Sequence, residues 1–491
     1  MYTCFRQIVT TLALMVAAGS AMARTQNAAW QDSITEYIES QINNGPLKGA
    51  IVGVCAVKIA GNDGGKQLVA YNASTRMVPA SNMKLVTTGA ALHAFGPEYR
   101  FETGIGYSGK IGPDGTLKGD VYIIGGGDPT IGAADSTAYK ADALFWKWKT
   151  LLANAGIKRI DGNIIGDGTA YEGGLENIGW EYGDVWTYYA AGTDALCFYE
   201  NTIDLQVSAG ASVGDKVNMR QVYPDTPWLQ IENQGVTGPA GSGNSLLMQT
   251  SHLSSSAVLT GSYAIDRKPK REQAANKYGA LTCAHEFYKN LKATGWEVTG
   301  TYKTPDQVGG DGVAIIGHTQ SPTLARICRK TNYDSDNFYA EAIFRAMGEA
   351  ATEIAAYDSC LVAINEVLED IVPGKSGGIV QKDGSGLSRA SSISPEWMAG
   401  YLAAMAGNKA FVETLPHPGE GTLSALKNLE ARNFRIKSGS MGGTLCYSGY
   451  VLDQEGNPAL SISIMTNNLG CKLPEARKVL EQVLLLLSRQ N

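Results

Sequence analysis

Long hydrophobic runs are almost absent from this chain of 491 residues. Outside the N-terminus, no segment approaches the roughly 20 apolar residues that a transmembrane helix needs. Basic residues do not cluster and the formal net charge is -6, so nucleic acid is not expected as a partner. The sequence also lacks an H-E-x-x-H motif, a phosphate-binding loop and a dinucleotide fingerprint. We therefore expect neither a metal nor a cofactor.

Cysteine and histidine are scarce, with eight and five residues respectively. Spacings such as that between Cys55 and Cys197 fit no zinc pattern, and they do not support a disulfide framework, although pairing among the seven cysteines after Cys4 stays open. Cys55 and Cys446 lie in apolar, strand-like runs, where a thiol packs as a small buried side chain. No histidine lies in a nucleophile-elbow or triad-like context. A catalytic cysteine and a histidine-based triad are both disfavoured.

The first residues have the pattern of a signal peptide. Arg6 supplies a positive charge, residues 8–18 are apolar, and Ala21-Met22-Ala23 is a small-x-small cleavage site. The alternative is a buried or anchoring N-terminal helix. The pattern predicts a signal peptide over residues 1–23 and an exported protein, periplasmic or otherwise outside the cytoplasm, with no transmembrane anchor after cleavage.

Both ends of the mature chain predict elements of one antiparallel sheet covered by helices, an α+β fold. Apolar spacing favours helices over 30–42 and 474–488. Apolar runs bounded by turn residues favour strands over 50–60, 67–71, 433–440, 445–452 and 458–465.

The intervening stretch is rich in glycine and short strand-like pieces, which is typical of inserted, mainly β domains. We predict a catalytic domain over 24–98 and 310–491, interrupted by an insertion over 99–309. The insertion is predicted to comprise a larger part, 99–205 with 255–309, and a nested part over 206–254. Homo-oligomer formation stays open.

Ser81-Asn82-Met83-Lys84 is an S-x-x-K motif at the predicted start of a helix that runs to about Phe95. Three residues apart on a helix, Ser81 and Lys84 share one face, so the amine can serve the hydroxyl as a base. Burial, a nearby cation or the helix end would have to lower the lysine pKa for this role. For an isolated motif, an N-cap serine with a surface lysine is the more frequent explanation.

Ser335-Asp336-Asn337 lies just before a predicted helix over 338–347. Ser335 can relay a proton between Lys84 and a leaving nitrogen, and Asn337 can present its amide to a substrate backbone. A polar helix-capping loop is the alternative interpretation.

Lys437-Ser438-Gly439 is expected at the end of a strand. Lys437 and the Ser438 hydroxyl suit a substrate carboxylate, and Gly439 leaves room for a substrate backbone. The N–H groups of Ser81 and Ser440 are candidate oxyanion donors. An ordinary edge strand with an exposed lysine is the alternative.

In the order S-x-x-K, S-D-N, K-[TS]-G, these motifs are typical of serine acyl-transfer enzymes that use a lysine base. The chain resembles the D-alanyl-D-alanine carboxypeptidase/endopeptidases of the penicillin-binding protein 4 type, which are low-molecular-mass class C penicillin-binding proteins. Further matching stretches include Gly127-Asp128-Pro129-Thr130, Ile160-Asp161-Gly162-Asn163, Asp383-Gly384-Ser385-Gly386-Leu387-Ser388-Arg389 and Gly421-Thr422-Leu423.

The resemblance implies a serine DD-peptidase/β-lactamase-like catalytic domain. It implies that Ser81 is the acylated nucleophile, Lys84 its base, Ser335 and Asn337 the second motif, and Lys437 with Ser438 the carboxylate-binding third. It also implies a pocket for a diaminopimelate side chain, formed by Asp184, Arg389 and Met441.

The expected partners are peptidoglycan stem peptides, with β-lactam antibiotics as covalent inhibitors. Two other functions stay open from the sequence. A β-lactamase would share the acylation step but add fast deacylation, and a catalytically silent wall-binding protein would bind without turnover.

Overall fold

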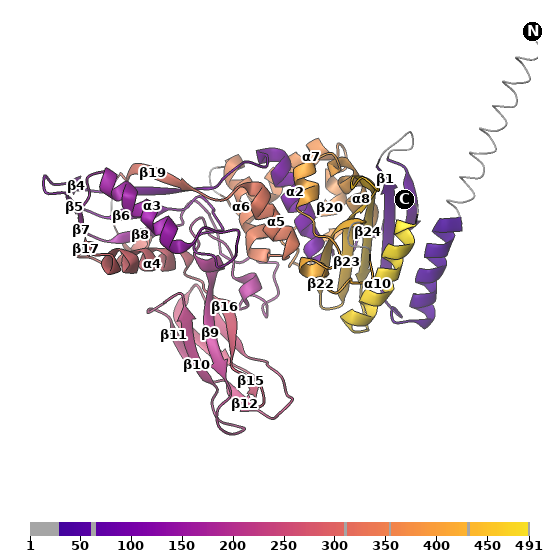
Figure 1. Cartoon of the computed structure of the whole chain (residues 1–491), viewed down its shortest axis with the longest axis horizontal. Coiled ribbons are helices and arrows are strands. Elements are labelled where there is room, and N and C mark those ends of the chain that lie inside the picture. Colours follow the sequence, from indigo (N-terminus) through magenta and orange to yellow (C-terminus); the bar gives the residue numbers. More distant parts are fainter. Residues whose placement is uncertain (1–28, 60–64, 309–311, 353–354, 430–432, 490–491) are drawn as a thin grey trace, which may run out of the picture. The chain divides into compact units, whose positions relative to one another are not determined.

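The structure is a computed structural model that describes residues 29–59, 65–308, 312–352, 355–429 and 433–489. The chain folds as two compact units, one of Met1–Asn82 with Ser392–Asn491 and the other of Met83–Ser391 (Figure 1). The predicted signal peptide lies outside the described residues. In the part that is described, no helix has both the length and the apolar character needed to cross a membrane.

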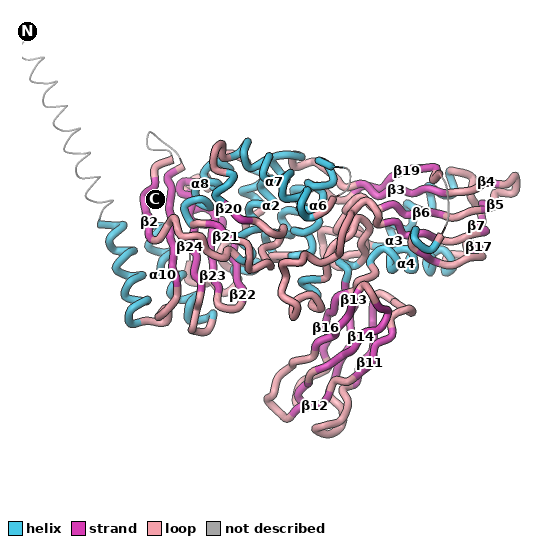
Figure 2. The backbone as a smooth tube through the Cα atoms, turned by 180° about the vertical axis from the view of Figure 1, so that it is seen from behind, coloured by secondary structure: helices cyan, strands magenta, loops and turns pink. Residues whose placement is uncertain are grey.

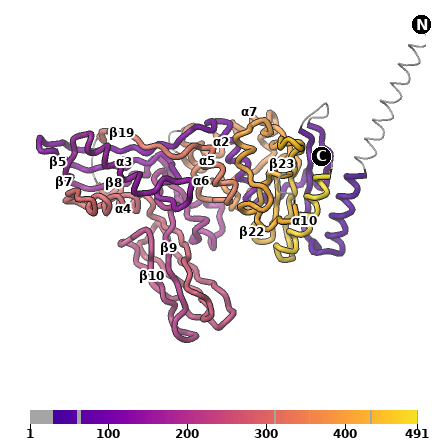
Figure 3. The backbone as a smooth tube through the Cα atoms, in the orientation of Figure 1, coloured from indigo at the N-terminus to yellow at the C-terminus, as the bar shows by residue number. Residues whose placement is uncertain are grey.

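A five-stranded antiparallel sheet forms the centre of the first unit, and both ends of the chain contribute strands to it (Figure 3). The strand order is β2-β1-β24-β23-β22. Its strands are β1 (Ile51–Lys58), β2 (Gln67–Tyr71), β22 (Phe434–Met441), β23 (Thr444–Leu452) and β24 (Pro458–Asn467). The predicted sheet is confirmed, with strand ends within one or two residues of those expected.

Helices cover both faces of this sheet (Figure 2). They are the helix over 29–44, α8 (Pro395–Met405), the short α9 (Lys409–Glu413) and α10 (Leu473–Ser488). Val52 and Val54 of β1 pack in one core with the helix over 29–44 and α10. Cys55 of the same strand packs on the opposite side against Ala399 of α8. Because β1 is covered on both faces, it is apolar throughout rather than alternating, and the predicted α+β class is confirmed.

The second unit contains a group of packed helices around α2 (Met83–Phe95). The helices that contact α2 are α5 (Leu324–Tyr333), α6 (Asn337–Thr352) and α7 (Tyr357–Ile371). Every residue of α2 from Met83 to Leu92 is buried. A helix buried on all sides must be apolar all round, as this one is apart from Lys84 and two threonines.

The rest of the second unit is mainly β structure with two helices. One five-stranded sheet has the order β18-β8-β6-β3-β19, and a four-stranded sheet has the order β17-β7-β5-β4. Their strands are β3 (Glu102–Tyr107), β4 (Lys110–Ile111), β5 (Thr116–Lys118), β6 (Val121–Ile124), β7 (Arg159–Asp161), β8 (Ile164–Asp167), β17 (Glu297–Val298), β18 (Tyr302–Lys303) and β19 (Ala314–Gln320). Trp148 of α3 (Ala141–Asn154) and Phe287 of α4 (Gly279–Ala293) meet edge to face in their core.

Consecutive strands between residues 202 and 275 form three smaller sheets with a separate core around Tyr263 and Leu205. The strands are β9 (Thr202–Ser208), β10 (Asn218–Tyr223), β11 (Gln230–Asn233), β12 (Val236–Gly238), β13 (Leu247–Ser251), β14 (Ser254–Thr260), β15 (Ser262–Ala264) and β16 (Lys270–Ala275). The predicted limits of the catalytic, inserted and nested domains remain a hypothesis.

The seven cysteines within the described ranges are free thiols. Cys55 and Cys446 are fully buried, as their apolar runs predict. Burial raises the pKa of Cys55 to about 11, so its thiol stays protonated and unreactive near neutral pH. Over the same ranges, no three His, Cys, Asp or Glu side chains are grouped so that they could hold a metal ion.

Trp30 joins the two helices that lie against the same face of the sheet, and its replacement should destabilise the first unit. Its indole N–H donates to the carbonyl of Leu486 at 2.8 Å, and the ring is buried. We expect Trp30→Ala to lower the free energy of unfolding by about 3–5 kcal/mol. Trp30→Phe, which removes chiefly the hydrogen bond, should cost about 1 kcal/mol. Urea unfolding checks both values, and equal losses would contradict this division.

Candidate active site

Ser81 lies in a 3-10 turn, Ala80–Asn82, that leads directly into α2. The amide of Asn82 donates to the carbonyl of Pro79 at 3.2 Å, and its side chain donates to the Ser448 hydroxyl of β23 at 2.7 Å. Ala80 has a left-handed backbone with φ of 48°. The predicted position of Ser81 at a helix N-terminus is confirmed. The turn is fixed to the sheet by a buried hydrogen bond.

The third motif lies within β22 and not at its end, because the strand continues to Met441. Gly439 pairs with Cys446 of β23. A Cβ at Gly439 would lie 2.6 Å from the carbonyl oxygen of Pro79 and 2.9 Å from the amide of Asn82. The glycine therefore lets the strand approach the turn that carries Ser81, a reason that the sequence pattern did not indicate.

Lys437 and Ser438 have different surroundings on this strand. Lys437 is buried, and its Nζ donates to the carbonyl of Ser438 at 2.7 Å. The Ser438 hydroxyl donates to Oγ1 of Thr422 at 2.7 Å. Ser440 is exposed and Met441 is half-buried. Thr422 was not among the predicted site residues, although it belongs to the Gly421-Thr422-Leu423 stretch that carries part of the resemblance.

In the second unit, the amine of Lys84 is fully buried and hydrogen-bonded. Its Nζ lies 2.6 Å from Oδ1 of Asn337 and 2.8 Å from the carbonyl oxygen of Ser385. Both partners are acceptors. A neutral amine has two N–H groups for these acceptors and keeps a lone pair that can take a proton. The structure thus joins the predicted base to the second motif.

Burial lowers the pKa of Lys84 to about 8. The carboxylates of Asp383, Glu341 and Asp336 oppose this shift by favouring the ammonium. The prediction invoked burial, a neighbouring cation and the helix end, and burial is the largest cause. A lysine with a pKa near 8 is neutral often enough at neutral pH to act as a base.

The second motif lies in the connection between α5 and α6. Ser335 adopts a left-handed backbone with φ of 61°. Oδ1 of Asp336 accepts a hydrogen bond from the amide of Tyr339 at 3.0 Å, which caps the helix. Asn337 is the first residue of α6 and directly follows the capping residue Asp336. The predicted helix is confirmed, and its cap fixes the position of Asn337.

A loop over residues 383–388 holds the Ser385 carbonyl that faces Lys84. Glu341 of α6 accepts from the amides of Gly384 and Ser385 at 3.2 and 2.8 Å. Asp383 accepts from the amides of Gly386 and Ser388 at 2.8 and 2.7 Å. Glu341 and Asp383 were not predicted as site residues. The glycine- and serine-rich run around Asp383 was the available signal, because such loops depend on side-chain acceptors.

Asp184 and Arg389 each have a close partner in the second unit. Oδ1 of Asp184 accepts from the Tyr189 hydroxyl at 2.8 Å. Nε of Arg389 lies 2.6 Å from Oε1 of Glu181, and both side chains are about half exposed. Glu181 was not predicted to take part. A ligand carboxylate that uses Arg389 would have to compete with this ion pair.

The antiparallel sheet between helices, together with a serine at a helix N-terminus and a buried lysine one helical turn later, is the arrangement expected of an α+β serine hydrolase. The D-Ala-D-Ala carboxypeptidase 3 (S13) family matches residues 34–490, and the chain belongs to that family.

Relatives and solved structures agree with this membership. A D-alanyl-D-alanine carboxypeptidase from an Actinomadura species is 28% identical over 91% of this chain and 84% of its own length. The D-alanyl-D-alanine carboxypeptidase DacB of Haemophilus influenzae is 27% identical over 81% of this chain and 82% of its own. The crystal structure of penicillin binding protein 4 from Haemophilus influenzae matches with a TM-score of 0.78 and 23% identity, covering 93% and 98% of the two chains. The last match shows a shared fold.

A side chain at Gly439 should disturb the contact between β22 and the Ser81 turn. Because the nearest atoms are backbone atoms, they cannot move aside as a flexible side chain would. We expect Gly439→Ala to lower the free energy of unfolding by about 1–3 kcal/mol. Gly470→Ala is the matched control, since nothing lies within 4 Å of its Cβ. Chemical denaturation of both variants measures the difference, and equal stabilities would contradict the close approach.

Proposed function

We propose that this protein is a serine-type D-Ala-D-Ala carboxypeptidase and DD-endopeptidase that acts on peptidoglycan stem peptides through an acyl-enzyme on Ser81. The observation that carries the proposal is the buried amine of Lys84, hydrogen-bonded to Asn337 and to the Ser385 carbonyl and one helical turn after Ser81. Membership of the D-Ala-D-Ala carboxypeptidase 3 (S13) family supports the same reaction.

The proposed reaction has two stages. In the first, neutral Lys84 takes the proton of the Ser81 hydroxyl while its oxygen attacks the carbonyl carbon of the penultimate D-alanine. The C–N bond to the leaving residue then breaks, and Ser335 relays the proton to the leaving nitrogen. In the second, water attacks the ester, releases the shortened peptide and restores Ser81. The amides of Ser81 and Ser440 are the proposed donors to the oxyanion.

Substrate binding is assigned to the third motif and to residues outside the three motifs. Lys437 and Ser438 are proposed to hold the terminal carboxylate, with Thr422 orienting the Ser438 hydroxyl. Gly439, which has no side chain, is proposed to leave room beside them for the substrate backbone. Asp184, Arg389 and Met441 are proposed to receive the charged side chain of the stem peptide. A carboxylate for its ammonium and a guanidinium for its carboxylate make a complementary pair.

Peptidoglycan lies outside the cytoplasm, so the proposed substrate agrees with the export signal predicted for residues 1–23. β-Lactam antibiotics are proposed as covalent inhibitors that acylate Ser81. A solved structure of Haemophilus influenzae penicillin binding protein 4 is complexed with a novel β-lactam, which supports this part of the proposal.

Replacing Ser81 should abolish both acylation and peptide cleavage. We expect wild-type protein to gain the mass of benzylpenicillin and Ser81→Ala to gain none, because the ester is proposed to form on the Ser81 hydroxyl. Intact-protein mass spectrometry and release of D-alanine from a D-Ala-D-Ala peptide measure the two effects. Ser40→Ala is the control, since Ser40 is exposed and its hydroxyl donates to the Tyr37 carbonyl within a helix. Full cleavage by Ser81→Ala would refute the assignment.

The lifetime of the adduct separates the proposed enzyme from its alternatives. A persistent adduct on the wild type, with peptide cleavage, is expected of a DD-peptidase. Rapid loss of the drug with no accumulated adduct would identify a β-lactamase. Binding of stem peptides without turnover would identify a silent wall-binding protein.

The acylation rate should rise with pH through about 8. The pKa of Lys84 is lowered by burial to about 8, and only the neutral amine can accept the Ser81 proton. The fraction of Lys84 in the neutral form therefore grows as pH rises through that pKa, and it shrinks as pH drops below that pKa. Rate constants for acylation by benzylpenicillin between about pH 6 and about pH 9 measure the profile. Lys84→Arg should remove acylation, because a guanidinium stays charged. A flat profile would exclude Lys84 as the base.

A further inference from the structure

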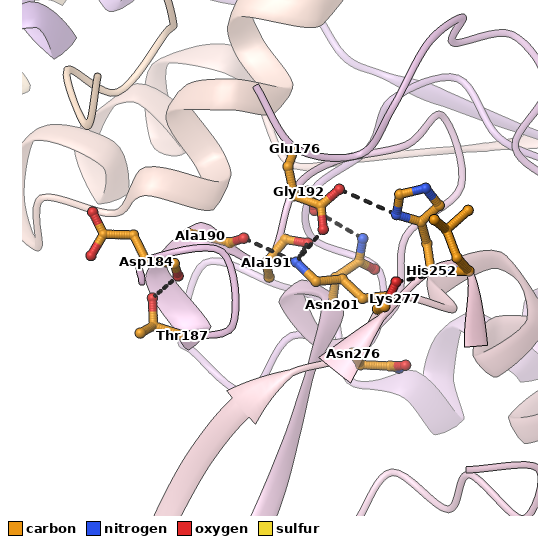
Figure 4. Close-up of polar contacts among 12 residues, drawn as sticks. Glu176, Asp184, Thr187, Ala190, Ala191, Gly192, Asn201, His252, Asn276 and Lys277 are labelled. Atoms are coloured by element: carbon orange, nitrogen blue, oxygen red, sulfur yellow. Dashed lines mark hydrogen bonds and ion pairs between the residues drawn. The ribbon is translucent and has the colours of Figure 1, made fainter. Parts of the chain in front are cut away.

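A buried lysine–glutamate pair lies in the second unit outside all three motifs (Figure 4). Lys277 occupies the short connection between β16 and α4, and its side chain is 0% exposed. Its Nζ lies 2.9 Å from Oε1 of Glu176, whose side chain is 17% exposed. A buried ammonium is costly unless it is paired and hydrogen-bonded, so its surroundings must supply partners.

Two backbone carbonyls supply those partners. Nζ of Lys277 donates to the carbonyl oxygens of Ala190 and Ala191 at 3.2 and 3.0 Å. Together with Glu176, these acceptors use the three N–H groups of the ammonium. The second carboxylate oxygen of Glu176 lies 3.4 Å from Nδ1 of His252, in the turn between β13 and β14. Lys277 therefore links Glu176 to the segment over residues 189–192, which begins in a short 3-10 turn.

Four successive carbonyls of this segment, Tyr189 to Gly192, each accept a hydrogen bond from a side chain. The middle two face Lys277. The carbonyl of Gly192 accepts from Nδ2 of Asn201 at 3.0 Å, and the carbonyl of Tyr189 accepts from Nδ2 of Asn337 at 2.9 Å. The segment is therefore held by the nearby Asn201 and by two side chains far away in the sequence, Lys277 and Asn337.

The contact at Tyr189 determines which way the amide of Asn337 points. A carbonyl oxygen only accepts, so the NH₂ group of Asn337 must face Tyr189. The other end of the amide, Oδ1, then faces Nζ of Lys84 at 2.6 Å. Reversing the amide would place a donor against the Lys84 amine. A well-fixed Tyr189 carbonyl thus keeps an acceptor beside the base.

We propose that Lys277 and Glu176 are a positioning ion pair for the acyl-transfer site. By holding the carbonyls of Ala190 and Ala191, Lys277 fixes the Tyr189 carbonyl, and this carbonyl fixes the Asn337 amide against Lys84. The same segment carries the Tyr189 hydroxyl that donates to Asp184. This inference rests on the proposed function, because its effect is on acylation.

A double-mutant cycle tests the proposal in the full-length protein. The variants are Lys277→Met, Asn337→Ala and the double variant, and the readout is the rate constant of acylation by benzylpenicillin, followed by quenching and mass spectrometry. We expect Lys277→Met to slow acylation about 10-fold when Asn337 is present and less than about 2-fold when it is absent. An equal loss in both backgrounds overturns the proposal, because it means that Lys277 acts only through general stability.

Lys289→Met is the matched control. It removes a lysine–glutamate pair, Lys289 with Glu286 at 3.1 Å on α4, that has no contact with the segment over 189–192 among the contacts described. It should leave the acylation rate unchanged. Should Lys277→Met fail to fold, Glu176→Gln keeps the size of the side chain and should slow acylation about 3-fold, again only when Asn337 is present. If the folded wild type is not acylated at all, the proposed function fails and not the positioning role.

Discussion

The chemistry proposed for this chain depends on one buried amine. Lys84 lies in a helix whose first ten residues are all buried, so its charge cannot be dispersed in water. The fold resolves this cost by placing two acceptors, Asn337 and the Ser385 carbonyl, around the nitrogen. The burial that destabilises the ammonium is the same burial that makes the lysine a usable base. The second motif and the loop over 383–388 can both be understood as supports for these two acceptors.

Each of these two acceptors is in turn positioned by a further hydrogen bond. The backbone N–H of Ser385 donates to Glu341, which positions the Ser385 carbonyl, and the Asn337 side-chain amide donates to the Tyr189 carbonyl. Ser385 lies in a loop and Tyr189 in a short 3-10 turn, Tyr188–Ala190. In both segments, polar backbone groups are bound by side chains, which can make a short irregular connection rigid. Lys277 extends this pattern one step further from the amine.

Much of the first unit could be predicted from the sequence, because apolar runs and turn residues are local signals. The sheet from both chain ends follows from strands such as 50–60 and 458–465, and the position of Ser81 follows from Pro79 and the helix after it. The order of the three motifs, S-x-x-K, S-D-N and K-[TS]-G, also indicated the reaction class. Local patterns carry this information because strands and helices have fixed periods.

The supporting residues could not be predicted in the same way. Lys277 and Glu176 are about one hundred positions apart and look like ordinary surface charges in the sequence. Thr422 and Glu341 matter only through partners that folding brings near. Gly439 was expected to make room for a substrate, and its closest neighbours are the backbone atoms of Pro79 and Asn82. These roles depend on burial and on contacts between residues far apart in the sequence, and no local periodic pattern in the sequence reveals them.

The pairing of β1 with β24 has a consequence for how the protein acquires its structure. Val57 and Ser461, which are hydrogen-bonded neighbours in this sheet, lie 404 positions apart in the chain. β1 can pair early with the neighbouring β2, but its other edge must wait for β24 until nearly the whole polypeptide has been made. Contacts of such high order form slowly, and an uncovered strand edge invites aggregation. The second unit, whose residues are continuous in the chain, has no such delay, so it is the natural first part to fold.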